Sequence, residues 1–233
     1  MPAVSSRMGR PRVLTREAIV HAVLDVGFAD LTVAAVRQRL GVGQTTLYRY
    51  AADRDELVRI GLSHVLEQAP WPSTAGPWRT VMRRYARAMW TLWEAHPGSA
   101  AEVARGVIPL GAMPLIDDLC AVLIRQGFTA GDAILACDIV FDMVTDSRAN
   151  VEQLVTRDPN AGGEHLREHG GEYPNRVEEP ADRAATDDER RAIREAMAEA
   201  YGADPLEWMT RKLEVILDGV ERSAARTLRS APP

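Results

Sequence analysis

Four polar side chains within six residues have the chemistry to read DNA bases. Gln44 can form a bidentate pair with adenine, and Thr45 or Thr46 can meet a thymine methyl group or a phosphate. Arg49 can meet guanine or a phosphate. Residue types and spacing in this run therefore predict recognition of bases in the major groove of DNA.

The same run predicts a short helix from Gln44 to Tyr50. Leu47 would point away from the polar side chains and anchor the helix on an apolar core. Tyr48 and Tyr50 can donate hydrogen bonds to phosphates while their rings fix the helix. We therefore expect one exposed face and one buried anchor.

The preceding residues predict the other half of a helix-turn-helix. Thr32 can cap a helix that runs to Leu40, and it is also a candidate DNA contact. Gly41 suits a left-handed helix end, and the Gly41-Val42-Gly43 turn leads into the reading helix. Asp53 and Glu56 have the spacing of a capping box, which would open a fourth helix that ends near Glu67. A helix-turn-helix places its second helix in the major groove.

The charge distribution favours DNA binding by the N-terminal part. Residues 1–50 hold seven Arg and three acidic residues, which gives them a net charge of +4. Because the whole chain has a net charge of −5, residues 51–233 carry −9. Phosphate contacts supply most non-specific affinity for DNA, and a basic end on an acidic body suits that role. Chance scatter of surface charge is the alternative.

Helical periodicity continues through the rest of the chain, and no strand is predicted. We expect an all-α fold: an N-terminal three-helix helix-turn-helix head on a larger helical ligand-binding and dimerisation bundle. The expected parts are a basic arm at 1–14, a DNA-binding domain at 15–68, and a bundle at 78–228 that contains a flexible loop at about 157–188.

Several classes of protein are disfavoured. No run of about 20 apolar residues and no signal sequence occurs, so we expect a cytoplasmic protein without a membrane partner. Cys120 and Cys137 lie in apolar stretches and are expected to be core residues rather than a redox pair. No Cys, His or acidic cluster has metal-ligand spacing, so no metal or cofactor is expected. A helical-bundle enzyme is an alternative function, but no nucleophile–base pair or phosphate loop in the sequence supports it.

Residues 10–66 resemble the DNA-binding domain of the TetR family of bacterial transcriptional regulators. The resemblance rests on Leu31-Thr32, Leu40-Gly41-Val42, Thr46 to Tyr50, and Asp53 to Leu57. It implies that Arg54 binds a phosphate at the start of its helix. It also implies that Arg10 and Arg12 belong to a basic arm along the DNA backbone or in the minor groove.

The chain departs from the family at one position of the second helix. The family usually has a small residue just after the apolar position matched by Val36, where this chain has Arg37. Either Arg37 reaches a phosphate, which makes it a candidate DNA contact, or the helix is slightly displaced.

Residues 78–226 resemble the C-terminal region of the tetracycline-repressor-like branch of this family, through Trp78-Arg79, His96-Pro97 and the order of helices. The resemblance implies a homodimer in which the 129–155 and 205–228 helices pair with their twins. The candidate interface residues lie on the last helix: Met209, Leu213, Ile216, Leu217 and Val220. An intramolecular core is the alternative for this apolar stripe.

The resemblance also implies an effector pocket between the helices of the bundle. Its candidate walls are aromatic, sulfur-containing and aliphatic side chains: Tyr85, Met89, Trp90, Trp93, Val103, Met113, Cys137 and Phe141. Each of these is also a plausible core residue, and such walls suit a small hydrophobic or planar effector.

The expected function is that of a repressor that leaves a palindromic operator when the effector binds. A ligand-independent or activating regulator of the same fold is the alternative.

Overall fold

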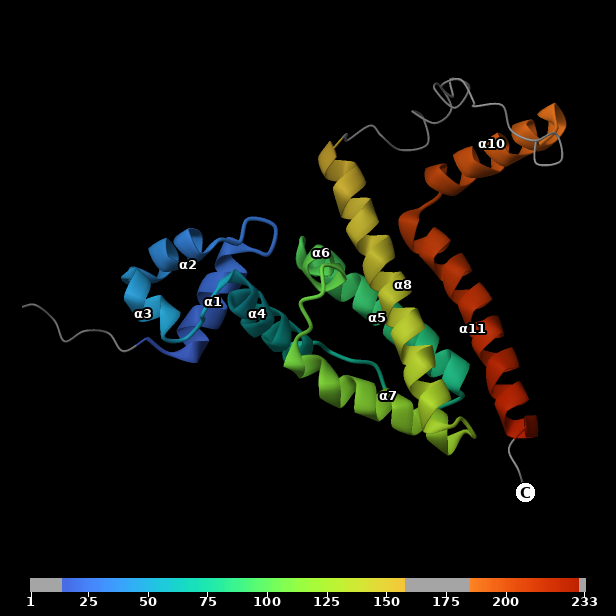
Figure 1. The fold of residues 1–233 in the computed structure, drawn as a ribbon, viewed down its shortest axis with the longest axis horizontal. Coiled ribbons are helices and arrows are strands. Elements are labelled where there is room, and N and C mark those ends of the chain that lie inside the picture. The colour runs from blue at the N-terminus through green and yellow to red at the C-terminus, as the bar shows by residue number, and fades with distance from the viewer. Residues whose placement is uncertain (1–13, 158–184, 231–233) are drawn as a thin grey trace, which may run out of the picture.

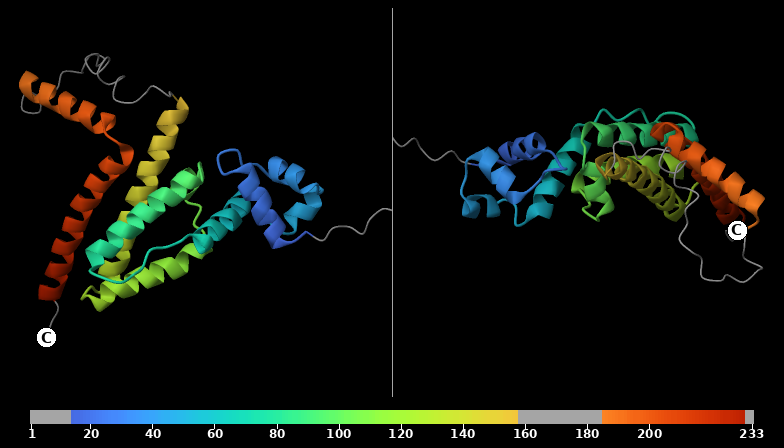
Figure 2. Two further views of the ribbon diagram at one scale, coloured as in Figure 1. Left: turned by 180° about the vertical axis from the view of Figure 1, so that it is seen from behind. Right: turned by 90° about the horizontal axis from the view of Figure 1, so that it is seen from above.

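The computed structural model describes residues 14–157 and 185–230 of the 233-residue chain. Every regular element in these two stretches is a helix, which confirms the predicted all-α fold. We call residues 15–68 the head and the residues from 78 onward the body. Figure 1 shows the head at one end of the long axis and the body at the other, and the two views in Figure 2 agree.

The head consists of four helices: α1 (Arg16–Val26), α2 (Val33–Leu40), α3 (Gln44–Tyr48) and α4 (Arg54–Gln68). Three of them begin at side-chain caps. Thr15, Thr32 and Asp53 each accept a hydrogen bond from the backbone N–H three residues on, at 3.2, 3.0 and 2.8 Å. Such caps satisfy backbone donors that have no partner inside the helix. Helix α2 ends at Gly41 in the left-handed conformation (φ 65°), as predicted.

The capping box predicted at the start of α4 forms only in part. The carboxylate of Asp53 caps the helix, but Oε2 of Glu56 accepts from Nη1 of Arg59 at 2.7 Å. A reciprocal box forms instead at Thr186 and Glu189, at the start of α10 (Asp187–Gly202). Arg59 lies one turn after Glu56, so the ion pair competes with the bond back to the cap.

The body is built around one long central helix, α8 (Ala130–Arg157). This helix contacts four others, which surround it: α5 (Trp78–Ala95), α6 (Ser99–Ala104), α7 (Met113–Arg125) and α11 (Pro205–Ser230). A 3₁₀ turn, η1 (Leu110–Ala112), precedes α7. Figure 1 shows α11 running beside α8, and α10 leading away from the bundle.

Helix α5 buries one apolar face in the core. Val81, Met82, Tyr85, Met89 and Trp93 are all buried. Burying a large apolar side chain of this kind contributes about 1.5–3 kcal/mol relative to leaving it exposed. The indole Nε1 of Trp93 donates to Oγ1 of Thr145 at 3.2 Å, so its one polar group is satisfied inside the core. This face therefore anchors α5 on α8.

The head rests directly on the body. An added Cβ at Gly98 (φ 86°) would lie 2.4 Å from the backbone nitrogen of Ala29, so only glycine permits this close approach. On α4, Oγ of Ser63 accepts from the backbone N–H of Gly111 at 3.3 Å. The head and body thus meet both at the α1–α2 loop and along α4.

Ion pairs join α5 to α11. Nη2 of Arg79 lies 2.6 Å from Oδ1 of Asp218, and its Nη1 lies 2.9 Å from Oε2 of Glu221. Nε of Arg83 lies 2.5 Å from Oε1 of Glu214. Local sequence patterns do not predict these ion pairs, because the partners lie 131 to 142 residues apart in the chain.

The predicted loop at about 157–188 falls mostly on residues 158–184, which lie outside the described residues. Its edges are described: α8 extends to Arg157, and α10 begins at Asp187, so both ends of the predicted loop are helical. In the part of the chain that the structure describes, no helix is both long enough and apolar enough to cross a membrane.

Candidate nucleic-acid interface

Helix α3 presents its polar side chains outward, as predicted. Gln44, Thr45 and Arg49 are exposed, and the Tyr48 side chain is 44% exposed. Leu47 is only 1% exposed and packs in the core of the head. The division into an outward polar face and one buried anchor is what insertion into a DNA groove requires.

Helix α3 is shorter than predicted. It ends at Tyr48, so Arg49 occupies the C-cap, and Tyr50 lies one residue beyond. The backbone N–H groups of Tyr50 and Ala51 both donate to the carbonyl oxygen of Leu47, at 2.9 and 3.1 Å, which turns the chain towards α4. Both Arg49 and Tyr50 are still exposed beside the helix.

Two further features restrict side chains on α3. Nε2 of Gln44 donates to Oη of Tyr48 at 3.4 Å, so these two predicted contacts lie on one face. Thr46 is half-buried and therefore less accessible than Thr45. Because the Gln44–Tyr48 bond is long and exposed, a base or phosphate can replace it at little cost.

On α2, the unusual Arg37 is accommodated without a strong partner. Its neighbour Val36 is fully buried, whereas the Arg37 side chain is half-buried and has no ion pair among the described residues. A long aliphatic stem can cover apolar surface while its charged end reaches solvent. Arg39 is different, because its Nε donates to Oδ2 of Asp25 on α1 at 2.8 Å. The predicted DNA contacts of Arg37 and Thr32 stay predictions, and Oγ1 of Thr32 serves as the cap of α2.

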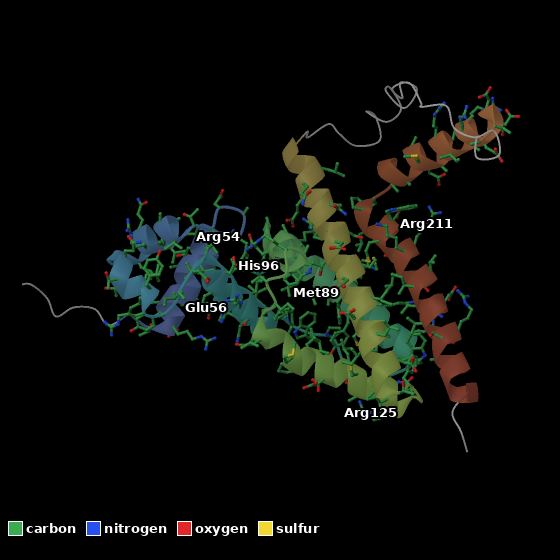
Figure 3. All side chains as sticks on the ribbon, in the orientation of Figure 1. Arg54, Glu56, Met89, His96, Arg125 and Arg211 are labelled. Atoms are coloured by element: carbon green, nitrogen blue, oxygen red, sulfur yellow. The ribbon has the colours of Figure 1, made fainter. Side chains whose placement is uncertain are left out.

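Arg54, the predicted phosphate contact, turns towards the body. Its Nε donates to the carbonyl oxygen of Leu31 at 2.8 Å, and its Nη1 and Nη2 donate to both carboxylate oxygens of Glu102 on α6, at 2.9 and 2.6 Å. A phosphate would have to compete with this bidentate pair. Its predicted role stays a prediction, and Figure 3 shows Arg54 near the junction of head and body.

Glu102 is the centre of a four-residue ion-pair network between the head and the body. Nη2 of Arg105 lies 2.7 Å from Oε2 of Glu102 and 2.6 Å from Oδ1 of Asp55 on α4. Burial raises the pKa of Glu102, but the hydrogen bonds from Arg54 and Arg105 outweigh burial and hold the pKa below its usual value. The sequence analysis missed Glu102 because its partner Arg54 lies 48 residues earlier in the chain.

The predicted arm residues Arg10 and Arg12 lie outside the described residues. Their contacts with the DNA backbone or minor groove stay predictions.

The predicted effector-pocket residues form part of the body core. Tyr85, Met89, Trp90, Trp93 and Cys137 are buried, and Val103 and Phe141 are half-buried against the core. Met113, at the start of α7, is 43% exposed. None of the eight residues lines the cavity between α8 and α11 or the cavity formed by α1, α4 and α5. The predicted pocket therefore stays a prediction.

The two cysteines lie together in this core. Their sulfur atoms are 3.7 Å apart, on α7 and α8. Burial raises the pKa of the Cys137 thiol, and its neighbour Cys120 raises it further. A thiol held in its neutral form is a poor nucleophile, so the geometry suits a packing role.

The predicted dimer-interface residues divide into two groups. Met209, Leu213 and Leu217 are 2, 2 and 0% exposed, because they pack inside the chain. Their burial agrees with the intramolecular alternative, and their predicted role at a dimer interface stays a prediction. Ile216 and Val220 are half-buried and line a cavity of about 290 Å³ between α8 and α11, so they still fit the prediction.

The chain is similar to known transcriptional regulators. It is 25% identical over 173 residues to an HTH-type transcriptional regulator of Saccharopolyspora erythraea, a match that covers 70% of this chain and 73% of that one. It is 26% identical over 138 residues to the HTH-type transcriptional repressor DrrR1 of Streptomyces coeruleorubidus, covering 56% of this chain and about half (51%) of that one. No protein-family model matches the sequence.

Among solved structures, the chain resembles the Streptomyces coelicolor TetR family protein ActR in complex with actinorhodin. The TM-score is 0.72 at 20% sequence identity, and the superposition covers 91% of this chain and 97% of ActR. The agreement extends over both the head and the body. The chain therefore has the fold of the TetR family of regulators, and its sequence is similar to those of HTH-type transcriptional regulators.

Proposed function

We propose that this protein is a DNA-binding transcriptional regulator that inserts α3 into the major groove of its operator. The observation that carries the proposal is the construction of α3, where exposed polar side chains surround a single buried anchor, Leu47. Gln44, Thr45 and Arg49 would meet base edges or phosphates. Tyr48 and Tyr50 would donate to phosphates on either side.

Arginines around α3 would hold the DNA backbone. Arg37 is half-buried beside the reading helix and has no ion-pair partner among the described residues. Arg10 and Arg12 would add an arm along the DNA. Because this partner is chromosomal DNA, we place the protein in the bacterial cytoplasm.

A homodimer and a palindromic operator belong to the same proposal. Two reading helices must reach successive major grooves about one helical turn apart, which a single head cannot do. Apolar side chains remain exposed on α8 beside the cavity at α11, notably Leu135 and Ile139. With Ile216 and Val220, they form a surface that a second copy would cover.

We further propose that a small hydrophobic effector releases the operator. ActR, which shares this fold, has been solved with actinorhodin bound, and DrrR1 is a repressor. In this chain, the Arg54–Glu102 ion pair links the first turn of α4 to α6 in the body. An effector that moves α6 would move α4 and change the spacing of the two heads. It must bind the two arrangements with different affinity to do so.

The proposal is tested by selecting bound sequences from random double-stranded DNA with the purified full-length chain. We expect the selected sites to be palindromes with half-sites about one helical turn apart. Placing such a site before a reporter gene then distinguishes a repressor from an activator. Selection of no common sequence would contradict the proposal, and an asymmetric site would contradict the dimer.

A further inference from the structure

A second cavity lies at the junction of the head and the body, apart from the predicted effector pocket. Its volume is about 740 Å³, and it is lined by α1, the second half of α4, the segment 69–72 and one face of α5. The buried face of α5 with Met89 and Trp93 does not contribute to it. Cavities of about 300–1,000 Å³ hold small organic ligands. We call it the junction groove; Figure 3 shows one of its residues, His96, between the head and the body.

One wall of the junction groove is a fixed aromatic surface. The Trp71 ring stacks on Tyr85, with 5.7 Å between ring centroids and an interplanar angle of 3°. The indole Nε1 of Trp71 donates to the carbonyl oxygen of Leu66 at 2.9 Å. Both contacts hold the ring in place, so a flat ligand would meet a preformed surface at a small cost in entropy. Leu24 and Leu92 extend this apolar wall.

The charged groups of the junction groove have one sign. None of its 15 lining residues is acidic, although the whole chain carries a net charge of −5. Arg84 and Arg87, one turn apart on α5, both line it. Arg87 is exposed and has no carboxylate partner among the described residues. This differs from Arg79 of the same helix, which pairs with Asp218 and Glu221.

The guanidinium group of Arg84 is only partly hydrogen-bonded among the described residues. One of its terminal amino groups donates to the carbonyl oxygen of Ala75, which fixes the side chain. Its Nε is buried and has no hydrogen-bond partner among the described residues. A buried donor without an acceptor is costly, and an ion or water bound beside it is one way to satisfy such a group.

Two histidines, His64 and His96, also line the junction groove. His96 packs edge-on against Phe28, with 6.5 Å between ring centroids. Burial lowers the pKa of His96, so at neutral pH the ring is uncharged and can donate or accept a hydrogen bond. His64 on α4 lines the same groove. Arg84 and Arg87 give the groove two permanent positive charges.

We propose that the junction groove binds a small organic anion that carries a carboxylate or sulfonate on a flat ring system. Arg84 and Arg87 take the anionic group, because guanidinium groups form strong, directional hydrogen bonds with such oxygens. Trp71 and Leu92 take the ring system. The occupant touches α1 and α4 of the head and α5 of the body at once.

The test uses two fluorescent probes on the full-length chain. One is 1-anilinonaphthalene-8-sulfonate, an aromatic sulfonate with a flat naphthalene ring; the other is N-phenyl-1-naphthylamine, which has the same ring system and no charge. We expect the sulfonate to bind more tightly. Arg87→Gln should weaken sulfonate binding about tenfold and leave the uncharged probe unchanged, since it removes one charge-assisted contact. Equal sulfonate binding by Arg87→Gln and the unaltered protein would overturn the proposal.

Two further variants keep the result interpretable. Arg211→Gln makes the same chemical change on α11, away from the head, and should leave both probes unaffected (Figure 3). Ala88→Phe places a ring in the groove and should abolish binding of both probes. Thermal unfolding checks that each variant is folded. If folded Ala88→Phe binds the probes as the unaltered protein does, the ligand lies elsewhere and the proposal is wrong.

An effect of the anion on DNA binding would rest on the proposed function and is a separate measurement. Operator affinity with and without the sulfonate tests that link. A protein that binds the sulfonate in the junction groove but selects no DNA would leave this inference standing and contradict the proposed function.

Discussion

Arg49 at the end of α3 is exposed and has no carboxylate partner among the described residues, whereas Arg79 on α5 is held by Asp218 and Glu221 of α11. The two residues have the same side chain but different surroundings. Arg37 and Arg49, beside and at the end of α3, have no ion-pair partner among the described residues, whereas Arg79 and Arg83 of the body join α5 to α11. An open cation can bind a phosphate or base, and a paired one cannot without first losing its partner.

Arg54 shows why position in the chain is not enough to assign such a role. It lies on α4 in the head, but its guanidinium group is paired with Glu102 of the body. By its surroundings it belongs with the helix-joining arginines. Arg87 is the reverse case, since it lies in the body and remains open. The predictions below test this division between open and paired cations and the core that supports it.

The largest expected effect comes from the anchor beneath the open side chains. Leu47→Ala removes the buried side chain that holds α3, and we expect the free energy of unfolding to fall by about 2–5 kcal/mol. Urea denaturation followed by circular dichroism measures this loss. An unchanged midpoint would show that α3 is held in another way. The exposed neighbour Thr45→Ala is the control and should leave stability within about 0.5 kcal/mol.

Arg49→Ala should weaken operator binding by about 1–3 kcal/mol if Arg49 meets a base, and should relax the preference at one base pair. Fluorescence anisotropy with a labelled operator measures the affinity. Arg125→Ala at the far end of α7 is the matched control and should change little (Figure 3). If Arg49→Ala alters neither affinity nor its dependence on salt, α3 is not the reading helix.

Glu102→Gln tests the arginines that are paired with carboxylates. Removing the carboxylate leaves Arg54 and Arg105 without their shared partner, and we expect a loss of about 1–2 kcal/mol in the free energy of unfolding. We expect a loss of this small size because the Arg54 side chain is 34% exposed, so solvent partly screens its charge. Thermal or urea unfolding at pH 7 measures it, with Glu94→Gln at the surface as a comparison.

The same pair predicts a pH dependence with a definite sign. The pKa of Glu102 is held below its ordinary value of 4.5 in the folded protein. Its contribution to stability is therefore present above that value and is lost as the pH falls through the folded-state pKa. The stability difference between the unaltered protein and Glu102→Gln should shrink in acid. A difference that stays constant from pH 7 to pH 3 would contradict the assignment.

The smallest effect is expected for a paired arginine at the surface. Arg83→Ala breaks the pair with Glu214 on α11, and we expect a loss of about 0–1 kcal/mol because both side chains are largely accessible to solvent. The loss should diminish further as salt is added. A loss of several kcal/mol would mean that the contact between α5 and α11 depends on the ion pair rather than on the apolar contacts beneath it.

The amino-acid sequence by itself determined the elements of the head and which of their residues face outward. Thr32 caps α2, Gly41 ends it and Asp53 caps α4, each as predicted. Such boundaries depend on bonds between residues three or four apart, so local residue types are sufficient to define them. The alternation of polar side chains around Leu47 likewise follows from helical periodicity.

Only the tertiary structure decided which long-range partner each side chain has. Arg54 meets Glu102 because the fold brings the first turn of α4 beside α6, 48 residues later in the chain. Met209, Leu213 and Leu217 share a stripe with Ile216 and Val220, yet packing of α11 on α8 and α5 buries the first three within the chain. The junction groove combines residues of α1, α4 and α5. Periodicity shows that a face is apolar, but which surface covers it depends on how the helices pack.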